Sequence, residues 1–438
     1  MNAPAGPVGA SSPVGEIADP TALPGRSLER NTLALAVSAL ITGMIGMLYW
    51  AVIARWYPAR EVGAAAAVIT TATMLSAFGN LSLGAVFERF LPMAGRRSRT
   101  MVWLGFSVGG VFGSVLAGLF LVLGPTDEMF ENRWQMLTFP VIVVVFSAFA
   151  LLDQTAVALR EAGWAAGKNV LHALAKLVLA LALAYTASRL AVIWTWTIAA
   201  GVGVAVLGVA VARRLRTAGY IDRPSLLPPR REIGQYLFAS YGIYVVSALA
   251  PLMLPLIVVA RLGADANAYF AISWSLVTAV LVLLTMLTGP YVAAAAAEPD
   301  RVAELTRKFL VLLATVCAGG IVLFSVAGPF LLAMVGERYR DEGEPLLRLA
   351  AVALVPASVA FAYTAIARVR RKLVLATTVQ LVNAALILGI SIAFVPARGL
   401  SAMGWAYIVA ESVSAVILLV PLVRSIRWVS DPAQSSVN

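Results

Sequence analysis

Ionisable side chains inside long apolar segments are the residues of this sequence best suited to do chemistry. Asp153, His172, Lys176 and Glu411 all lie in such segments. A charge at the centre of a membrane costs about 2.5 to 3.5 kcal/mol on insertion scales, so each one needs a partner or a function. Glu411 lies near the middle of its segment and is a candidate for binding a coupling proton or sodium ion. Asn383 lies at a similar depth and could contact Glu411, which would make the two a structural pair.

Asp153 and Lys176 form a second candidate set. They lie at similar depths on consecutive segments, and His172 precedes Lys176 by one helical turn. A lone buried charge is costly, whereas a paired one is tolerated. We therefore predict an ion pair between Asp153 and Lys176, and we leave open whether it is structural or whether Asp153 binds a coupling ion.

Basic residues at segment ends suggest phosphate chemistry. Arg55 and Arg261 occupy equivalent ends of two segments, and Arg89 follows Glu88 at the end of another. A guanidinium group forms paired hydrogen bonds with phosphate oxygens. The alternative is that these side chains only reach toward the polar edge of the membrane. We place the three arginines in a substrate cavity, together with two polar candidates from the same segments, Asn80 and Tyr241.

Other chemistries have little support in the sequence. Cys317 and His172 are the only residues of their types, so no disulfide can form within the chain and a zinc site would be hard to build. The stretch 163–169 has one residue too few between its glycines for a phosphate loop, and no Ser or Thr follows its Lys. We expect no cofactor, no metal and no enzymatic activity.

The elements that position these residues are long apolar segments. Hydrophobic residues make up 61% of the 438 residues and charged residues 13%, against about 45 to 50% and about 25% in soluble domains. Each segment is near the ~20 residues that cross a membrane as a helix. The chain is therefore predicted to be an all-α integral membrane protein with twelve spans, at 31–56, 62–87, 101–123, 135–159, 168–187, 190–212, 234–261, 267–290, 307–327, 345–367, 373–395 and 401–423.

The twelve segments form a repeat, because the second six follow the first six at an offset of about 206 residues. An even number of spans in each copy gives both copies the same orientation, as in transporters whose halves move against each other. We predict two parallel six-helix lobes, with the arrangement found in MOP and MATE proteins. The predicted domains are a disordered tail at 1–25, lobes at 26–222 and 223–427, and a second tail at 428–438.

The distribution of basic residues predicts the orientation. Of the 33 Lys and Arg residues, 24 fall on the side of the membrane that holds both termini and 9 on the other side. Because positive loops stay inside, both termini are predicted to be cytoplasmic. The same bias explains the net charge of +11 without a nucleic-acid partner.

Glycine and proline mark the pliable spans. The first span contains Gly43 and Gly46, and the seventh contains Pro251 and Pro255 at nearly matching positions of the repeat. Irregular backbone at membrane depth survives only beside protein or water, so such sites point to a transporter's cavity. The eighth span ends with Gly289-Pro290, and the matching position of the second span holds Leu83-Gly84. We therefore predict that spans one, two, seven and eight are pliable and surround a central cavity, with hinges at the four residues of spans one and seven. The alternative is that Gly and Pro are simply frequent in membrane helices.

The start of the chain carries a recognisable pattern. An Asn-Thr pair precedes the first span, an Arg and a Gly bracket the junction to the second span, and a Gly, an Arg and a Pro close the second. The stretches are Asn31-Thr32, Arg55-Trp56-Tyr57-Pro58-Ala59-Arg60-Glu61-Val62-Gly63 and Gly84-Ala85-Val86-Phe87-Glu88-Arg89-Phe90-Leu91-Pro92. This pattern resembles the polysaccharide-transporter family, the lipid-linked oligosaccharide flippases of the MOP exporter superfamily. The second copy keeps the Arg in Ala260-Arg261 but has Tyr269 in place of the Gly.

The resemblance implies that a polyprenyl-pyrophosphate-linked oligosaccharide crosses the membrane through a central, often cationic cavity while the two lobes rock. It also implies a location in the bacterial plasma (inner) membrane. The implied partners are the lipid-linked saccharide, membrane lipids, and polysaccharide polymerase or ligase machinery. No cofactor is implied.

Three other functions stay open. MATE-like drug or cation antiporters share the fold and commonly have an acidic residue in the first span, whereas residues 33–54 contain none. Major-facilitator carriers also have six plus six spans, and they share a sequence pattern in the loop after the second span. Here Glu88, Arg89 and Gly95 match that pattern only in part, because the spacing before the Gly is different. A channel or scaffold of the cell envelope would need no transport cycle, but the repeat and the prolines favour a moving carrier.

Overall fold

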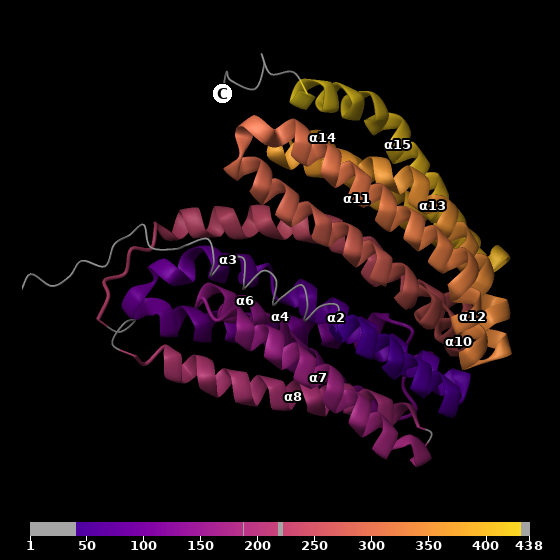
Figure 1. Ribbon diagram of the computed structural model, residues 1–438. Helices are drawn as coiled ribbons and strands as arrows, with labels where there is room; N and C mark the ends of the chain where they lie inside the picture. The colour runs from indigo at the N-terminus through magenta and orange to yellow at the C-terminus, as the bar shows by residue number, and fades with distance from the viewer. Residues whose placement is uncertain (1–40, 187, 218–221, 431–438) are drawn as a thin grey trace, which may run out of the picture.

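The computed structural model describes residues 41–186, 188–217 and 222–430, which are drawn as coloured ribbon in Figure 1. Within these ranges the secondary structure is helical, without strands. The first half comprises helix Ile41–Trp56 and the helices α2 (Ala59–Gly79), α3 (Leu83–Phe90), α4 (Ser98–Leu123), α5 (Thr126–Met129), α6 (Arg133–Ala158), α7 (Ala162–Ala182) and α8 (Arg189–Arg214).

The second half begins with the longest helix, α10 (Arg230–Ala297), which contains three internal prolines. It bends at Gly263, where φ is 85° and ψ is 179°, a conformation that favours glycine because other residues carry a Cβ atom. The bend divides α10 into two arms. The remaining helices are α11 (Val302–Val322), a π-helical turn (Leu323–Ala327), α12 (Gly328–Val335), α13 (Glu337–Val369), α14 (Val374–Arg398) and α15 (Ser401–Ser430).

The predicted spans all correspond to helices in the described part of the chain. Among the described residues, ten helical stretches are long and apolar enough to cross a membrane, and one of them, Ala248–Ala297, includes the bend of α10 and parts of both its arms. Helix Ile41–Trp56 is shorter, and the rest of the first predicted span, residues 31–40, lies outside the described residues, as does the tail at 1–25. The second tail was predicted to start at 428, but α15 continues to Ser430.

The second predicted span is interrupted rather than continuous. Leu81 and Ser82, between α2 and α3, have φ values of 50° and 56°. Positive φ is uncommon for residues other than glycine, and here it ends one helix and starts the next. The interruption ends two residues before Gly84, in one of the four spans predicted to be pliable.

The helices form two lobes, a first lobe (helix Ile41–Trp56 and α2 to α8) and a second lobe (α10 to α15). Figure 1 shows them as two groups that converge beside α12. The most extensive packing within the first lobe joins α4 to α6 and α7 to α8, and within the second it joins α15 to α13 and α14. Helix α10 packs on α13 and α14 and also on α2 of the other lobe. The lobe boundary predicted between residues 222 and 223 stays a prediction.

The lobes meet backbone to backbone at Gly63. A Cβ atom built on Gly63 would lie 1.6 Å from the carbonyl oxygen of Ala264. The buried Asn267 side chain donates a hydrogen bond of 2.8 Å to the Gly63 carbonyl. Small residues permit such close helix approach in membranes. We call this end of the bundle the Gly63 end, and the opposite end, where α4 begins and α8 ends, the Arg97 end.

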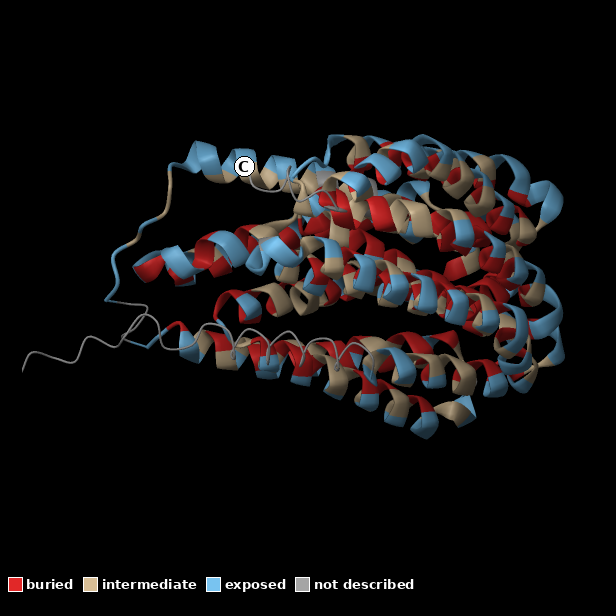
Figure 2. Cartoon of the chain, turned by 45° about the horizontal axis from the view of Figure 1, so that its top comes forward, coloured by how far each residue is buried: buried red, intermediate tan, exposed pale blue. Residues whose placement is uncertain are grey.

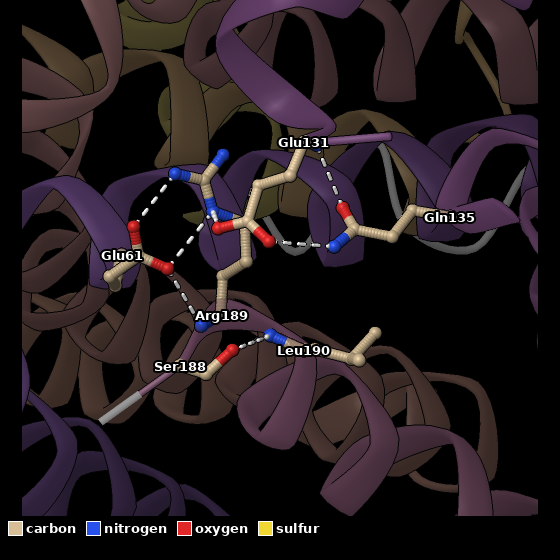
Figure 3. Close-up of polar contacts among 6 residues, drawn as sticks. All are labelled: Glu61, Glu131, Gln135, Ser188, Arg189 and Leu190. Carbon is tan, nitrogen blue, oxygen red and sulfur yellow. Dashed lines mark hydrogen bonds and ion pairs between the residues drawn. The ribbon is translucent and has the colours of Figure 1, made fainter. Parts of the chain in front are cut away.

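A polar cluster in the first lobe lies near the start of α2 (Figure 3). The Arg189 guanidinium group is 2.7 Å from Oε1 of Glu61 and 3.3 Å from Oε1 of Glu131. The backbone N–H of Arg189 also donates to Glu61 at 2.9 Å, and the amide of Gln135 donates to Glu131 at 3.0 Å. The starts of α2, α6 and α8 are thereby joined. These contacts tie the start of α2 to the rest of the first lobe.

The outward faces of the helices are apolar. On α4, Val111, Val115, Leu119 and Val122 recur at helical spacing and are all more than half exposed. Figure 2 shows buried residues on the sides of the helices that face one another and exposed residues on the outward sides. An apolar outer surface of this extent is suited to lipid rather than water. The protein is therefore a multi-pass membrane protein.

Candidate functional site

A central cavity of about 640 Å³ lies between the lobes. Its walls come from helix Ile41–Trp56, α2, and both arms of α10, which are the four spans predicted to surround it. Helices α7 and α8 add one residue each, Lys176 and Trp196. Three of the four predicted hinge residues line this cavity: Gly43, Gly46 and Pro255.

The glycines of the first helix are not required by packing against described residues. A Cβ atom on Gly43 or Gly46 would meet nothing within 4 Å. The fourth hinge candidate, Pro251, lines a different cavity inside the second lobe. The hinge role of all four residues stays a prediction.

Lys176 is the one charged side chain among the described residues that line the central cavity. Its Nζ lies 3.7 Å from the ring centre of Trp196 and 5.2 Å from that of Tyr49. Aromatic faces attract a cation through their quadrupole. The Tyr49 hydroxyl is in turn 2.8 Å from the hydroxyl of Thr195, which fixes its ring. The cavity thus offers a positive charge held by aromatic rings.

The predicted ion pair between Asp153 and Lys176 is wrong. The carboxylate of Asp153 instead lies 3.0 Å from Nζ of Lys168, which is buried and also donates to the carbonyl of Phe149. The reason is the position of α7. Because this helix begins at Ala162, Lys168 is already inside the bundle. Lys176 lies a further eight residues along α7, which is about 12 Å at 1.5 Å per residue, and so faces the central cavity.

We predict that Asp153 and Lys168 depend on each other for stability. Asp153→Asn or Lys168→Met alone should lower the free energy of unfolding by about 3 kcal/mol, because each leaves a buried charge without its partner. The double variant should recover most of that loss. Urea unfolding of the four proteins in detergent measures this coupling. A double variant no more stable than either single variant would contradict the pair.

A second cavity, of about 310 Å³, lies inside the second lobe. Glu411 of α15 and Asn383 of α14 both line it, and the Asn383 side chain is the polar neighbour of the Glu411 carboxylate. Asn383 also donates to the hydroxyl of Ser414 at 3.0 Å. Trp274 lines both this cavity and the central one, so it stands between them. The sequence predicted that Asn383 could contact Glu411, and the structure places their side chains next to each other.

The three predicted arginines occupy different places. Arg55 lines a groove of about 520 Å³ between helix Ile41–Trp56, the second arm of α10 and α12. Arg89 lies at the Arg97 end, where its guanidinium carbon is 4.5 Å from the ring centre of Tyr236. Arg261 is exposed near the bend of α10. Arg89 and Arg261 do not line the central cavity.

Asn80 and Tyr241 also lie away from the central cavity. The Asn80 side chain is buried inside the first lobe, where its Oδ1 accepts a hydrogen bond of 2.6 Å from Ser147. It follows the last residue of α2 and faces α6, so it serves the packing of the lobe. Tyr241 is half-buried on the first arm of α10. The sequence placed Asn80 correctly on the second span, but the direction of its side chain needed the structure.

Comparison with solved structures identifies the fold. Comparisons with protein families and with curated proteins give no match. A multidrug resistance MATE family transporter of the MOP superfamily, in an inward-facing conformation, matches with a TM-score of 0.69 and 12% identity over 91% of this chain and 99% of its own. An outward-facing structure of a MATE family transporter of that superfamily gives 0.60 with 14% identity over 92% and 97%.

A third neighbour is a MOP superfamily transporter from Pyrococcus furiosus. It matches with a TM-score of 0.58 and 15% identity over 92% of this chain and 97% of its own. For that protein, a reverse polarity of the binding pocket is described as suggesting a different function. All three neighbours cover nearly the whole chain at low identity. The chain therefore has the twelve-helix fold of the MOP superfamily transporters.

Proposed function

We propose that this protein is a flippase that moves a polyprenyl-pyrophosphate-linked oligosaccharide from the inner to the outer leaflet by alternating access. The observation that carries the proposal is Lys176 in the wall of the central cavity, with no acidic residue beside it among the described lining residues. A cavity with one positive charge suits an anionic head group. A cationic drug would instead need a negative charge there.

Several features support an anionic substrate. The first span contains no acidic residue from 31 to 56, so that helix offers no carboxylate to a cation. The fold also accommodates different pocket polarities, since the Pyrococcus furiosus neighbour is described with a reversed one. In our proposal, the pyrophosphate approaches from the Arg97 end past Arg89 and reaches Lys176 in the cavity. Charge-assisted hydrogen bonds make such contacts strong in a low-dielectric site.

The groove that contains Arg55 supports a lipid-linked substrate. It shares Met47 and Ser275 with the central cavity, so the two spaces adjoin. Leu48 and Met334 line the groove and are more than half exposed on the lipid-facing surface. A lipid-linked saccharide has an anionic part and a long apolar part. In our proposal, the first lies at Lys176 while the polyprenyl chain extends through this groove into the membrane.

The closed Gly63 end supports alternating access. The backbone of Gly63 lies against that of Ala264, so the two lobes are in contact at that end. The TM-score is also higher with the inward-facing neighbour, 0.69, than with the outward-facing one, 0.60. Combining this contact with the basic bias of the sequence, we place the Arg97 end and both termini in the cytoplasm. The protein would then reside in a bacterial inner membrane beside polysaccharide polymerase or ligase machinery.

The test is a flipping assay on the purified protein in liposomes. A fluorescent oligosaccharide linked to a polyprenyl pyrophosphate should become accessible to a membrane-impermeant quencher at a protein-dependent rate. The same saccharide on a polyprenyl chain without phosphate should cross slowly, because nothing on it binds Lys176. Equal rates for both lipids would contradict the anionic substrate, and export of a cationic drug without lipid movement would contradict the flippase.

A second candidate function is MATE-like export of a drug or cation. It is favoured by the MATE neighbours and by Glu411, whose carboxylate lies in a cavity separate from Lys176. An acid placed apart from the substrate site could carry a coupling ion in either function. Ion coupling therefore needs its own test.

We predict that Glu411→Gln abolishes the response of transport to an imposed proton or sodium gradient. Without the carboxylate, no charge is available to bind the driving ion, whereas movement down a substrate gradient should continue. The gradient response is measured in liposomes with imposed pH or sodium differences. Glu342→Gln, at an exposed acid on α13, is the matched control. If Glu411→Gln responds to both gradients as the unaltered protein does, Glu411 is not the coupling residue.

A further inference from the structure

A narrow groove of about 230 Å³ runs along the lipid-facing surface of the first lobe, at the Arg97 end. It lies between α4 and α8, with Leu152 of α6 also contributing. Trp103, on its α4 side, is 63% exposed. The groove shares no lining residue with the central cavity, so it is independent of the proposed substrate path.

The shape of the groove follows from helix periodicity. On α4 the lining residues are spaced by three or four, which places them on one face. The contributing stretch of α4, from Arg99 to Phe106, is about 10 Å long, and that of α8, from Val204 to Arg216, about 18 Å at 1.5 Å per residue. The middle of the groove is apolar, and at Gly208 there is no side chain to fill it. These features suit an extended aliphatic chain.

Both charged lining residues lie at the same end of the groove. Arg99 is in the first turn of α4, and Arg216 lies two residues beyond the end of α8. Both are exposed, and none of the ion pairs found in residues 41–186, 188–217 and 222–430 involves either of them. Two guanidinium groups at the end of an apolar groove are complementary to a phosphate at the end of an acyl chain.

We propose that this groove is a binding site for an anionic phospholipid of the leaflet at the Arg97 end. One acyl chain lies between α4 and α8, and Arg99 and Arg216 contact the lipid phosphate. Trp103 stands one helical turn from Arg99, at the depth where tryptophan side chains meet the polar edge of a membrane. The lipid packs α4 against α8 from outside and fills a gap that the side chains leave.

The experiment measures lipid binding to the purified full-length protein after removal of endogenous lipid. Phosphatidylglycerol and phosphatidylcholine with identical acyl chains are added in detergent, and bound lipid is counted by native mass spectrometry. The double variant Arg99→Ala with Arg216→Ala removes the phosphate contacts. Gly208→Leu fills the groove, and it fits because a Cβ atom there meets nothing within 4 Å. The matched controls are Arg213→Ala, an exposed arginine outside the groove, and Gly201→Leu, an equally open glycine outside it.

The unaltered protein should retain phosphatidylglycerol over phosphatidylcholine. The double arginine variant should bind phosphatidylglycerol about tenfold more weakly or worse, as expected for lost hydrogen bonds to a charged group. Gly208→Leu should weaken binding of both lipids, while the two controls behave like the unaltered protein. Equal retention of both lipids by the unaltered protein would overturn the proposal, as would a double arginine variant or a Gly208→Leu variant that binds normally.

Discussion

Replacing Lys176 with Met should lower the rate of lipid flipping by about tenfold to a hundredfold, the loss expected when hydrogen bonds to a charged group disappear. Methionine is unbranched and apolar, so it can fill the space beside Trp196 without adding a charge. No acidic residue among the described residues pairs with Lys176, and the variant therefore leaves no charge stranded. The variant should therefore lose transport without any loss of stability.

Lys168 supplies the matched control on the same helix. Lys168→Met strands the Asp153 carboxylate and should lower the free energy of unfolding by about 3 kcal/mol. Lys176→Met should not lower the free energy of unfolding, because it removes a buried charge that has no acidic partner among the described residues. Flipping and urea unfolding of both variants in the same preparation separate the two roles. Lys176→Arg should retain part of the activity because it keeps the charge.

Two results would contradict the assignment of Lys176. One is normal flipping of the pyrophosphate-linked substrate by Lys176→Met. The other is an equal loss for the same saccharide on a lipid without phosphate, because an effect independent of phosphate would indicate a structural role. Thr278→Val, a substitution of similar size in the same cavity, should leave the rate unchanged and excludes a general sensitivity of the cavity wall.

The arrangement of the helices could be predicted because it depends on properties that sequence displays directly. Apolar length predicts a span, and the offset of about 206 residues predicts two similar lobes. Matched Gly and Pro positions indicated the four spans that surround the central cavity, and Gly46 and Pro255 both line it. These features need no knowledge of which side chains touch.

Side-chain partners could not be predicted, because they depend on helix ends and rotation. The start of α7 at Ala162 brought Lys168 to Asp153 and left Lys176 for the cavity. Likewise, Arg189 lies between the predicted spans 168–187 and 190–212, whereas it is the first residue of α8 and pairs with both Glu61 and Glu131. Depth along a span gives a residue's level in the membrane but not the direction in which it points.

The second large effect is expected at the contact between the lobes. Gly63→Ala adds one methyl group at a point 1.6 Å from the carbonyl oxygen of Ala264, so the two helices must separate. Overpacking of this kind costs about 1 to 3 kcal/mol. A cost of about 2 kcal/mol paid only by the closed state would lower its population roughly thirtyfold relative to a state open at the Gly63 end.

The opening can be measured by chemical labelling. The natural cysteine is removed with Cys317→Ser, and Thr70→Cys places a thiol in the central cavity. We call the protein with only Cys317→Ser and Thr70→Cys the parent. A membrane-impermeant reagent added on the side of the Gly63 end should label the thiol faster when Gly63→Ala is added to the parent. Gly118→Ala is the control, because its Cβ atom meets nothing within 4 Å while the gain in helix propensity is the same.

Flipping should fall together with the faster labelling, because a carrier that cannot close at one end cannot load from the other. A Gly63→Ala protein that labels more slowly than the parent, or that flips at the parent rate, would show that the contact of Gly63 with Ala264 is only packing. If Gly63→Ala labels faster and loses flipping while Gly118→Ala behaves like the unaltered protein, the contact of Gly63 with Ala264 acts as the gate at the Gly63 end. The Asn267 hydrogen bond to the Gly63 carbonyl would then be one of the interactions that hold the gate closed.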